Sequence, residues 1–363
     1  TPPLPYLGHV EQVMTPVEVL RPAPEMTSLH RANTVFRVLL ACNVVLTAYW
    51  VVTQFTGHSA FYGGYQLTVS SVLAVLDVLV FGTLGWGLIW HGVKNLLLAK
   101  VVGMTSEDRK LVASSRMHHK FSVAEMTRRY SERRIRIIDM IGRRGRTFAL
   151  ALASFYHLYQ HIAVSPSNDF VTLFLGDQLL DAVVTGWVFI AAYRADGIVG
   201  AALYGSQTRI MDGTLARANC LMSINLWTLF KFILVPLGLA LAPLYEPQHF
   251  AIIFALIWGA YLVTDAAAEI GGSLYGRQTI KVIGLGDLNR KSVGGTVTGF
   301  IAGLTFCLGI ILTNGLGGTW ILLAVTIAAN STVLELISPR STDDFSIATG
   351  NALICWVFGM FIF

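Results

Sequence analysis

The stretch that decides the fold is Leu262 to Gly276, with the sequence LVTDAAAEIGGSLYG. It continues an apolar run that begins at Phe250 and is long enough for most of a membrane span. Two carboxylates, Asp265 and Glu269, stand four residues apart, so on a helix they lie on one face. Because acids at membrane depth are costly and usually serve a function, we expect a functional site here.

The composition of the whole chain is that of a membrane protein. Of its 363 residues, 54% are hydrophobic and only 13% are charged, whereas a soluble domain carries about 25% charged residues. Apolar runs of span length recur along the chain, and they predict an all-α, polytopic membrane helix bundle of about nine transmembrane helices. The predicted spans are about 34–55, 67–93, 147–164, 170–193, 218–242, 250–272, 293–313, 319–338 and 345–363.

The loops between the predicted spans differ sharply in charge. Residues 100–146 contain thirteen Lys and Arg residues against five Asp and Glu residues. The loops that fall on the opposite side contain no Lys or Arg; they are 56–66, 165–169, 243–249 and 314–318. Since loops on the non-translocated side carry the excess of Lys and Arg, we expect the basic loops in the cytoplasm, matrix or stroma.

This patterning divides the chain into four segments. They are a proline-rich arm (1–33), two transmembrane helices (34–98), a basic amphipathic polar segment (99–146) and a seven-helix membrane core (147–363). The prolines of the arm prevent a long helix. The basic segment has helical spacing, which is typical of a helix that touches anionic lipid headgroups. Nucleic-acid binding is not expected beside so many spans.

Charged residues inside the predicted spans have alternative interpretations. Asp177 and Asp181 stand one helical turn apart, and Lys231 is the clear cation within a span. A structural interpretation pairs Lys231 with one of these acids. A functional interpretation gathers several acids around a divalent cation. A transporter site built from the three residues is less favoured, because no inverted repeat is evident.

Two further groups of residues carry polar chemistry. Lys291-Ser292 stands where a predicted span begins, and backbone NH groups at a helix N-terminus beside a Lys can bind an anion. Glu335 precedes the loop that carries Asp343-Asp344, and such acids can cap a helix or bind Mg²⁺. Both loops fall on the basic side, so we expect these groups to converge at one membrane face. Phosphoryl transfer from a Mg²⁺-nucleotide needs such parts.

Three motifs in this region resemble those of the phytol, farnesol and dolichol kinase family, which is related to the CDP-diacylglycerol synthases. The motifs are Asp265-x-x-Ala268-Glu269-x-x-Gly272-x-x-Tyr275-Gly276, Lys291-Ser292-x-x-Gly295-Thr296, and Glu335 with Asp343-Asp344. Their order matches the family, and the likeness is best over 250–363. It implies a polytopic enzyme that phosphorylates an isoprenoid alcohol with Mg²⁺ and CTP or ATP.

The resemblance also implies roles for individual residues. It implies Mg²⁺ binding by five carboxylates of the motifs: Asp265, Glu269, Glu335, Asp343 and Asp344. It implies a catalytic set made of Asp265, Lys291 and Asp343, with Lys291 on the nucleotide phosphate. It implies nucleotide binding by small residues of the first two motifs: Gly272, Gly276, Ser292, Gly295 and Thr296.

The chain departs from the family pattern at several positions. The Gly expected before the motif Asp is Thr264, the basic pair expected after Gly272 is Ser273-Leu274, and the Asn expected after the Asp pair is Phe345. The family's Arg-Lys…His motif has no good match. Because one electrostatic contact is worth about 10²–10³ in rate, these losses indicate weakened or absent catalysis.

Two hypotheses therefore stand for the function. In the first, the chain is an active lipid-alcohol kinase whose isoprenoid alcohol enters from the bilayer. In the second, it is a catalytically inactive accessory subunit of a larger complex, with a bound phospholipid in the former active-site cleft. Segments 1–33 and 99–146 would supply docking surfaces for other subunits. Either form is expected in an organellar membrane, namely the mitochondrial inner membrane, the chloroplast or the endoplasmic reticulum.

Overall fold

In a computed structural model of the chain, almost all described residues are helical. The described residues are 26–56, 71, 86–113, 126, 128–144, 147, 170–192, 199–200, 203–204, 209–210, 216–282, 289–339 and 342–363. Most of the predicted arm and most of the predicted spans at 67–93 and 147–164 lie outside them. Helix α1 begins at Met26, within the predicted arm, because no proline follows Pro24 to stop a helix there.

Six described helices are long and apolar enough to cross a membrane, and they identify an integral membrane protein. These six are α1 (Met26–Thr56), α10 (Ala216–Leu241) with η4 (Ala242–Leu244), α11 (Pro247–Tyr275), α12 (Val293–Thr313), α13 (Thr319–Ile337) and α14 (Asp343–Phe361). Helix α8 (Phe170–Ala191) also forms where a span is predicted. The all-α membrane bundle is confirmed, while the count of about nine spans stays a prediction.

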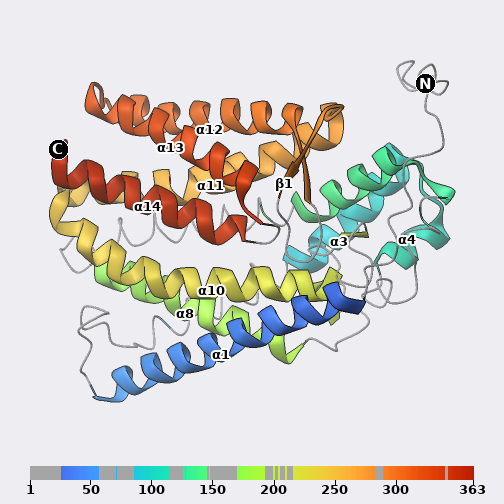
Figure 1. The fold of residues 1–363 in the computed structure, drawn as a ribbon, viewed down its shortest axis with the longest axis horizontal. Helices are drawn as coiled ribbons and strands as arrows, with labels where there is room; N and C mark the ends of the chain where they lie inside the picture. Colours follow the sequence, from blue (N-terminus) through green and yellow to red (C-terminus); the bar gives the residue numbers. More distant parts are fainter. Residues whose placement is uncertain are drawn as a thin grey trace.

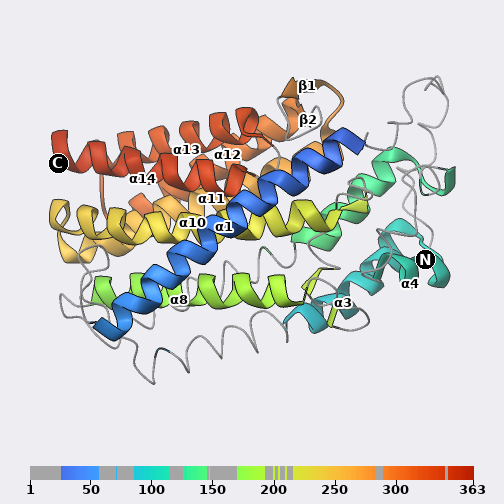
Figure 2. The ribbon, with the colours of Figure 1, turned by 60° about the horizontal axis from the view of Figure 1, so that its bottom comes forward.

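The long helices lie side by side, and a two-stranded hairpin and short helices gather at one end of the bundle (Figure 1). The short helices are α3 (Trp86–Leu97), η2 (Leu98–Val102) and α4 (Ser106–Ala113). Helix α1 crosses α10 obliquely (Figure 2). In the most apolar 18-residue stretch of α11, 78% of the residues are buried, whereas in the corresponding stretch of α1 only 11% are buried. Helix α11 is therefore central, and α1 is peripheral.

Helices α11 and α12 pack closely because α12 presents glycines every fourth residue: Gly295, Gly299 and Gly303. A Cβ at Gly295 would lie 2.6 Å from the carbonyl oxygen of Ala268 in α11. A Cβ at Gly303 would lie 2.3 Å from Oγ1 of Thr264. The glycines thus bring the α12 backbone against the face of α11 that lies beside its acids.

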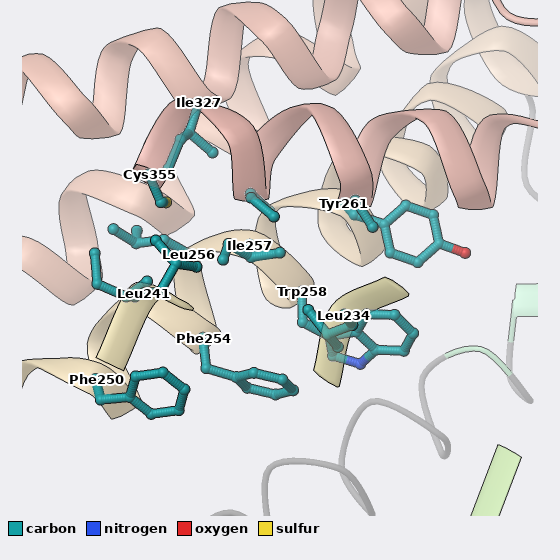
Figure 3. Packing of buried hydrophobic residues seen from close by; sticks show 14 of the residues in the cluster. Leu234, Leu241, Phe250, Phe254, Leu256, Ile257, Trp258, Tyr261, Ile327 and Cys355 are labelled. Carbon is teal, nitrogen blue, oxygen red and sulfur yellow. The ribbon is translucent and has the colours of Figure 1, made fainter. Parts of the chain in front are cut away.

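The apolar core lies between α11 and its neighbours (Figure 3). Trp258 of α11 stacks on Phe230 of α10, with ring centroids 5.9 Å apart. Tyr261, one turn further along α11, turns its hydroxyl away from the apolar cluster (Figure 3). The core therefore ends near Tyr261, where the polar residues begin.

A β-hairpin connects α11 to α12. Its strands are β1 (Thr279–Val282) and β2 (Asn289–Ser292), and they pair antiparallel with Ile280 opposite Lys291. The sequence predicted a basic loop here and no strands. The pairing fixes the backbone of Lys291 at the end of the bundle, where the first turn of α12 follows directly.

Candidate functional site

Three predicted metal ligands meet at the hairpin end of the bundle. Asp265 of α11, Glu335 of α13 and Asp343 of α14 each place one carboxylate oxygen within 4.8 Å of the others. Asp265 and Glu335 are buried, and Asp343 is partly exposed. These three residues are called the acidic centre below. Its convergence was expected from the loop topology, because all three residues lie at span ends on the basic side.

Lys291 joins two members of the acidic centre. Its Nζ lies 2.5 Å from Oε1 of Glu335 and 3.7 Å from Oδ2 of Asp343. Burial disfavours the charged ammonium, but the carboxylates of Glu335 and Asp343 outweigh it and raise the pKa of Lys291. Lys291 is therefore a charged bridge between α13 and α14.

Arginines from the basic segment reach the same site. Residues 132–144 are helical, and Arg144, the last of this described stretch, is 8% exposed. Its guanidinium donates hydrogen bonds to both carboxylate oxygens of Asp265 and also contacts Glu269. Burial opposes its charge, but Asp265 and Glu269 raise the pKa of Arg144 and keep it cationic. Such a forked contact fixes both partners.

Glu269 is surrounded by further arginines. Nη1 of Arg143 lies 2.8 Å from Oε1 of Glu269, and Nη2 of Arg209 lies 3.3 Å from the same oxygen. These contacts were not predicted, because the basic segment that carries Arg143 was expected at the lipid headgroups and the loop that carries Arg209 was expected only to lie on the basic side. One signal for them was available in the sequence. The three motifs contain five acids but only one cation, Lys291, so positive charge from another segment was to be expected.

The other predicted metal ligands have different partners. Asp344 accepts hydrogen bonds from Oγ of Ser223 at 2.8 Å and from the hydroxyl of Tyr261 at 2.5 Å. Neither Asp344 nor Glu269 belongs to the three-carboxylate group found among the described residues. The adjacent acids Asp343 and Asp344 also lie in the first turn of α14, where the helix dipole favours negative charge.

The residues predicted to bind nucleotide have capping and packing contacts. Oγ of Ser292 accepts a hydrogen bond from the backbone NH of Gly295 at 3.0 Å, and the hydroxyl of Thr296 donates to the carbonyl of Ser292 at 3.1 Å. A Cβ at Gly272 would lie 2.9 Å from Oγ of Ser292, and one at Gly276 would lie 2.7 Å from that atom. Ser292 thus caps α12 in close contact with the end of α11.

Two of the residues that differ from the resembled motifs, Thr264 and Phe345, pack against neighbouring helices. Thr264 is fully buried against the glycine face of α12, and its hydroxyl has no hydrogen-bond partner among the described residues. The ring of Phe345 meets Phe230 edge to face, with centroids 6.5 Å apart. Position 345 therefore extends the core of the bundle at the edge of the acidic centre.

The donor set of the acidic centre fits a hard divalent cation such as Mg²⁺. Oε2 of Glu335 is buried and has no hydrogen-bond partner among the described residues, which leaves one oxygen for a metal. Both oxygens of Asp265, however, accept hydrogen bonds from Arg144. The positive charge of the Arg144 guanidinium therefore competes with a cation for the Asp265 carboxylate.

A second charged group lies near the middle of α10, and we call it the lysine centre. Lys231 is fully buried, and its Nζ lies 2.8 Å from Oε1 of Gln178 in α8. The ammonium sits 4.0 Å from the ring centroid of Trp258 and 5.5 Å from that of Trp227. The charge of Asp181 also acts on it. This arrangement favours the structural interpretation of the residues.

No protein-family model, no curated protein and no solved structure matches this chain. The functional assignment therefore depends on the residues and contacts of the chain itself. The resemblance to the lipid-alcohol kinases stays a prediction that rests on the three motifs.

Proposed function

We propose that this chain is a catalytically inactive accessory subunit of a larger organellar membrane complex, with a bundle derived from a lipid-alcohol kinase. The observation that carries the proposal is the guanidinium of Arg144 on both oxygens of Asp265. The resemblance assigns Asp265 to Mg²⁺, and Mg²⁺ binds carboxylate oxygens through their negative charge. In this chain a buried internal cation takes those oxygens.

The ion pairs around the acidic centre support the same conclusion. Around the acidic centre, the ion-paired carboxylates among the described residues are Asp265, Glu269, Glu335 and Asp343, and the cations that pair with them are Arg143, Arg144, Arg209 and Lys291. Each of these carboxylates therefore already has an internal cation as its partner, while Asp344 beside them accepts hydrogen bonds from Ser223 and Tyr261. A buried pair also resists disruption, because removing one partner costs about 3–5 kcal/mol.

The peripheral helix α1 offers an apolar surface against which another subunit would pack. It exposes apolar side chains such as Val45, at 66%, and Phe55, at 87%. Bilayer lipid or the transmembrane helices of another subunit would cover these side chains. The proposal places a phospholipid in the former active-site cleft and partner subunits against segments 1–33 and 99–146.

An active kinase is the second candidate, and the acidic centre favours it. Three carboxylates within 4.8 Å of one another and a free oxygen on Glu335 are the parts of a Mg²⁺ site. In this function Mg²⁺ would neutralise phosphate charge, while Lys291 and Arg144 would bind the phosphates of CTP or ATP. Arg144 would then leave Asp265 when the nucleotide binds.

One assay separates the two candidates. The purified chain is incubated with labelled CTP or ATP, Mg²⁺ and phytol, farnesol or dolichol, beside Asp265→Asn and Lys291→Ala. We expect no lipid phosphate above the level of these variants, together with co-purification in a stoichiometric membrane complex. Lipid phosphate that forms with the unaltered chain and with Lys281→Ala, an exposed lysine on β1, but not with Asp265→Asn would establish the kinase instead.

A further inference from the structure

Arg144 supplies the positive charge that a divalent cation would otherwise supply to the carboxylates of this site. It donates to both oxygens of Asp265, contacts Oε2 of Glu269, and its charge acts on Glu335 as well. Glu335 is 7% exposed, and its Oε2 remains without a hydrogen-bond partner among the described residues. The acidic centre thus keeps an unused buried oxygen next to a guanidinium that serves as the counter-ion.

The segment that carries Arg144 has an apolar core of its own. Ile135 and Ile138 of the 132–144 helix are fully buried in a small cluster that is separate from the core of the bundle. The other members of this cluster are Leu98, Val102, Met104, Met126, Tyr130 and Ile210. Polar contacts connect this unit to α11: Arg133 donates to the carbonyl of Leu274 at 3.0 Å, and Arg143 pairs with Glu269.

We propose that Arg144 is a latch that keeps the acidic centre free of metal, and that its withdrawal opens a divalent-cation site at Asp265, Glu335 and Asp343. Among the described residues the two apolar clusters share no member, so a shift of the unit around the 132–144 helix would break its polar contacts with α11 before it disturbed the main core. Removal of one guanidinium frees both oxygens of Asp265 and leaves the ion-paired acids with an excess negative charge. Hard oxygen donors with negative charge bind Mg²⁺ and Mn²⁺.

The test measures binding of Mn²⁺ alone, by electron paramagnetic resonance, to the full chain in detergent. We expect Arg144→Ala and Arg144→Gln to gain one bound Mn²⁺ per chain and at least tenfold affinity over the unaltered chain. The gain should disappear when Glu335→Gln is added. Arg136→Ala is the matched control, since Arg136 lies on the same helix but pairs with Glu132 at the surface. It should bind no more Mn²⁺ than the unaltered chain.

Three results would overturn the latch. The first is Mn²⁺ binding by the unaltered chain that equals that of Arg144→Ala and is lost with Glu335→Gln. The second is no gain in either Arg144 variant while both keep their helical content. The third is loss of helical content in both variants, which would make Arg144 a purely structural ion pair. The inference rests on the proposed function, because in both of them Asp265 holds no metal in the unaltered chain. The two fail separately. Lipid phosphate made by the unaltered chain would contradict the proposed inactive subunit, whereas equal Mn²⁺ binding by the unaltered chain and Arg144→Ala would contradict the latch.

Discussion

The acidic centre and the lysine centre stabilise buried charge in different ways. The acidic centre lies at the hairpin end of the bundle, and its carboxylates pair with full cations from outside the spans, such as Arg144 and Lys291. The lysine centre lies near the middle of α10, where Lys231 contacts an amide oxygen and two indole rings. Long basic side chains of the loops reach the end of a bundle, but they do not reach its middle.

This difference in position and in partners suggests different roles for the two centres. In the acidic centre Asp343 is partly exposed and Lys291 lies outside the spans, so an ion that arrives from solution can exchange with Lys291 at Asp343. The ammonium of Lys231 has no such exchange, since it is fully buried and depends on Gln178, Asp181 and cation–π contacts. We therefore expect the acidic centre to respond to ligands and the lysine centre to set stability.

The largest effect is expected at the lysine centre. Lys231→Ala removes a fully buried ammonium together with its hydrogen bond to Oε1 of Gln178 and its contacts with the rings of Trp227 and Trp258. Breaking such a buried arrangement costs about 3–5 kcal/mol. Thermal unfolding in detergent should show a large fall in Tm. Lys281→Ala, on exposed β1, is the control and should change the free energy of unfolding by less than about 0.5 kcal/mol. If Lys231→Ala and Lys281→Ala have the same Tm, Lys231 has no structural role.

A smaller effect is expected where the core meets the acidic centre. Tyr261→Phe removes the hydroxyl that donates to Oδ1 of Asp344 at 2.5 Å. A buried acceptor that loses its donor costs about 1–3 kcal/mol, so the free energy of unfolding should fall by that amount. Tyr275→Phe is the control, because Tyr275 is 70% exposed. If the two substitutions lower Tm equally, the contact with Asp344 contributes nothing.

The pH dependence of Asp108 extends the comparison to a charge outside the bundle. Burial alone would raise the pKa of Asp108, but hydrogen bonds lower it below the usual value of 3.8. The donors are Thr105, Arg129 and Tyr130. A lowered pKa gives stability that is present above pH 3.8 and is lost as the pH falls through the folded-state pKa. Asp108→Asn should cost about 1 kcal/mol at pH 6 and little below the folded-state pKa, as Tm measured against pH should show.

The smallest effect is expected for an exposed ion pair. Arg136 pairs with Glu132 one turn earlier at 2.6 Å, with both side chains about one third exposed or more. Such surface pairs contribute about 0.3–0.5 kcal/mol. Arg136→Ala should therefore barely change Tm, and the difference should vanish at high salt. If Arg136→Ala lowered Tm as much as Lys231→Ala, the stabilising effect of a charged group would not depend on whether the group is buried or exposed.

Much of the fold could be predicted because its signals are local. The spans predicted at 293–313 and 319–338 agree closely with α12 and α13, since apolar runs and the glycines at the start of α12 mark their ends. The convergence of Asp265, Glu335, Asp343 and Lys291 followed from the placement of their loops on one side.

The contribution of the basic segment could not be predicted in the same way. Arginines in a polar loop satisfy their charge equally well in water, at headgroups or on a carboxylate, so spacing alone does not select Arg143 and Arg144. The hairpin was missed because Thr279–Val282 is short and largely exposed. The packing of Phe345 against Phe230 depends on how α14 meets α10, which periodicity does not determine.

The order of residues along the chain gives the contact between Arg144 and Asp265 a consequence for biosynthesis. Arg144 is synthesised well before Asp265, and Lys291 after it. We therefore expect the two acids of α11 to find their arginine partners during insertion, before α12 is synthesised. Because a carboxylate at membrane depth is unfavourable without a partner, such early pairing would stabilise α11 in the bilayer until α12 packs against it.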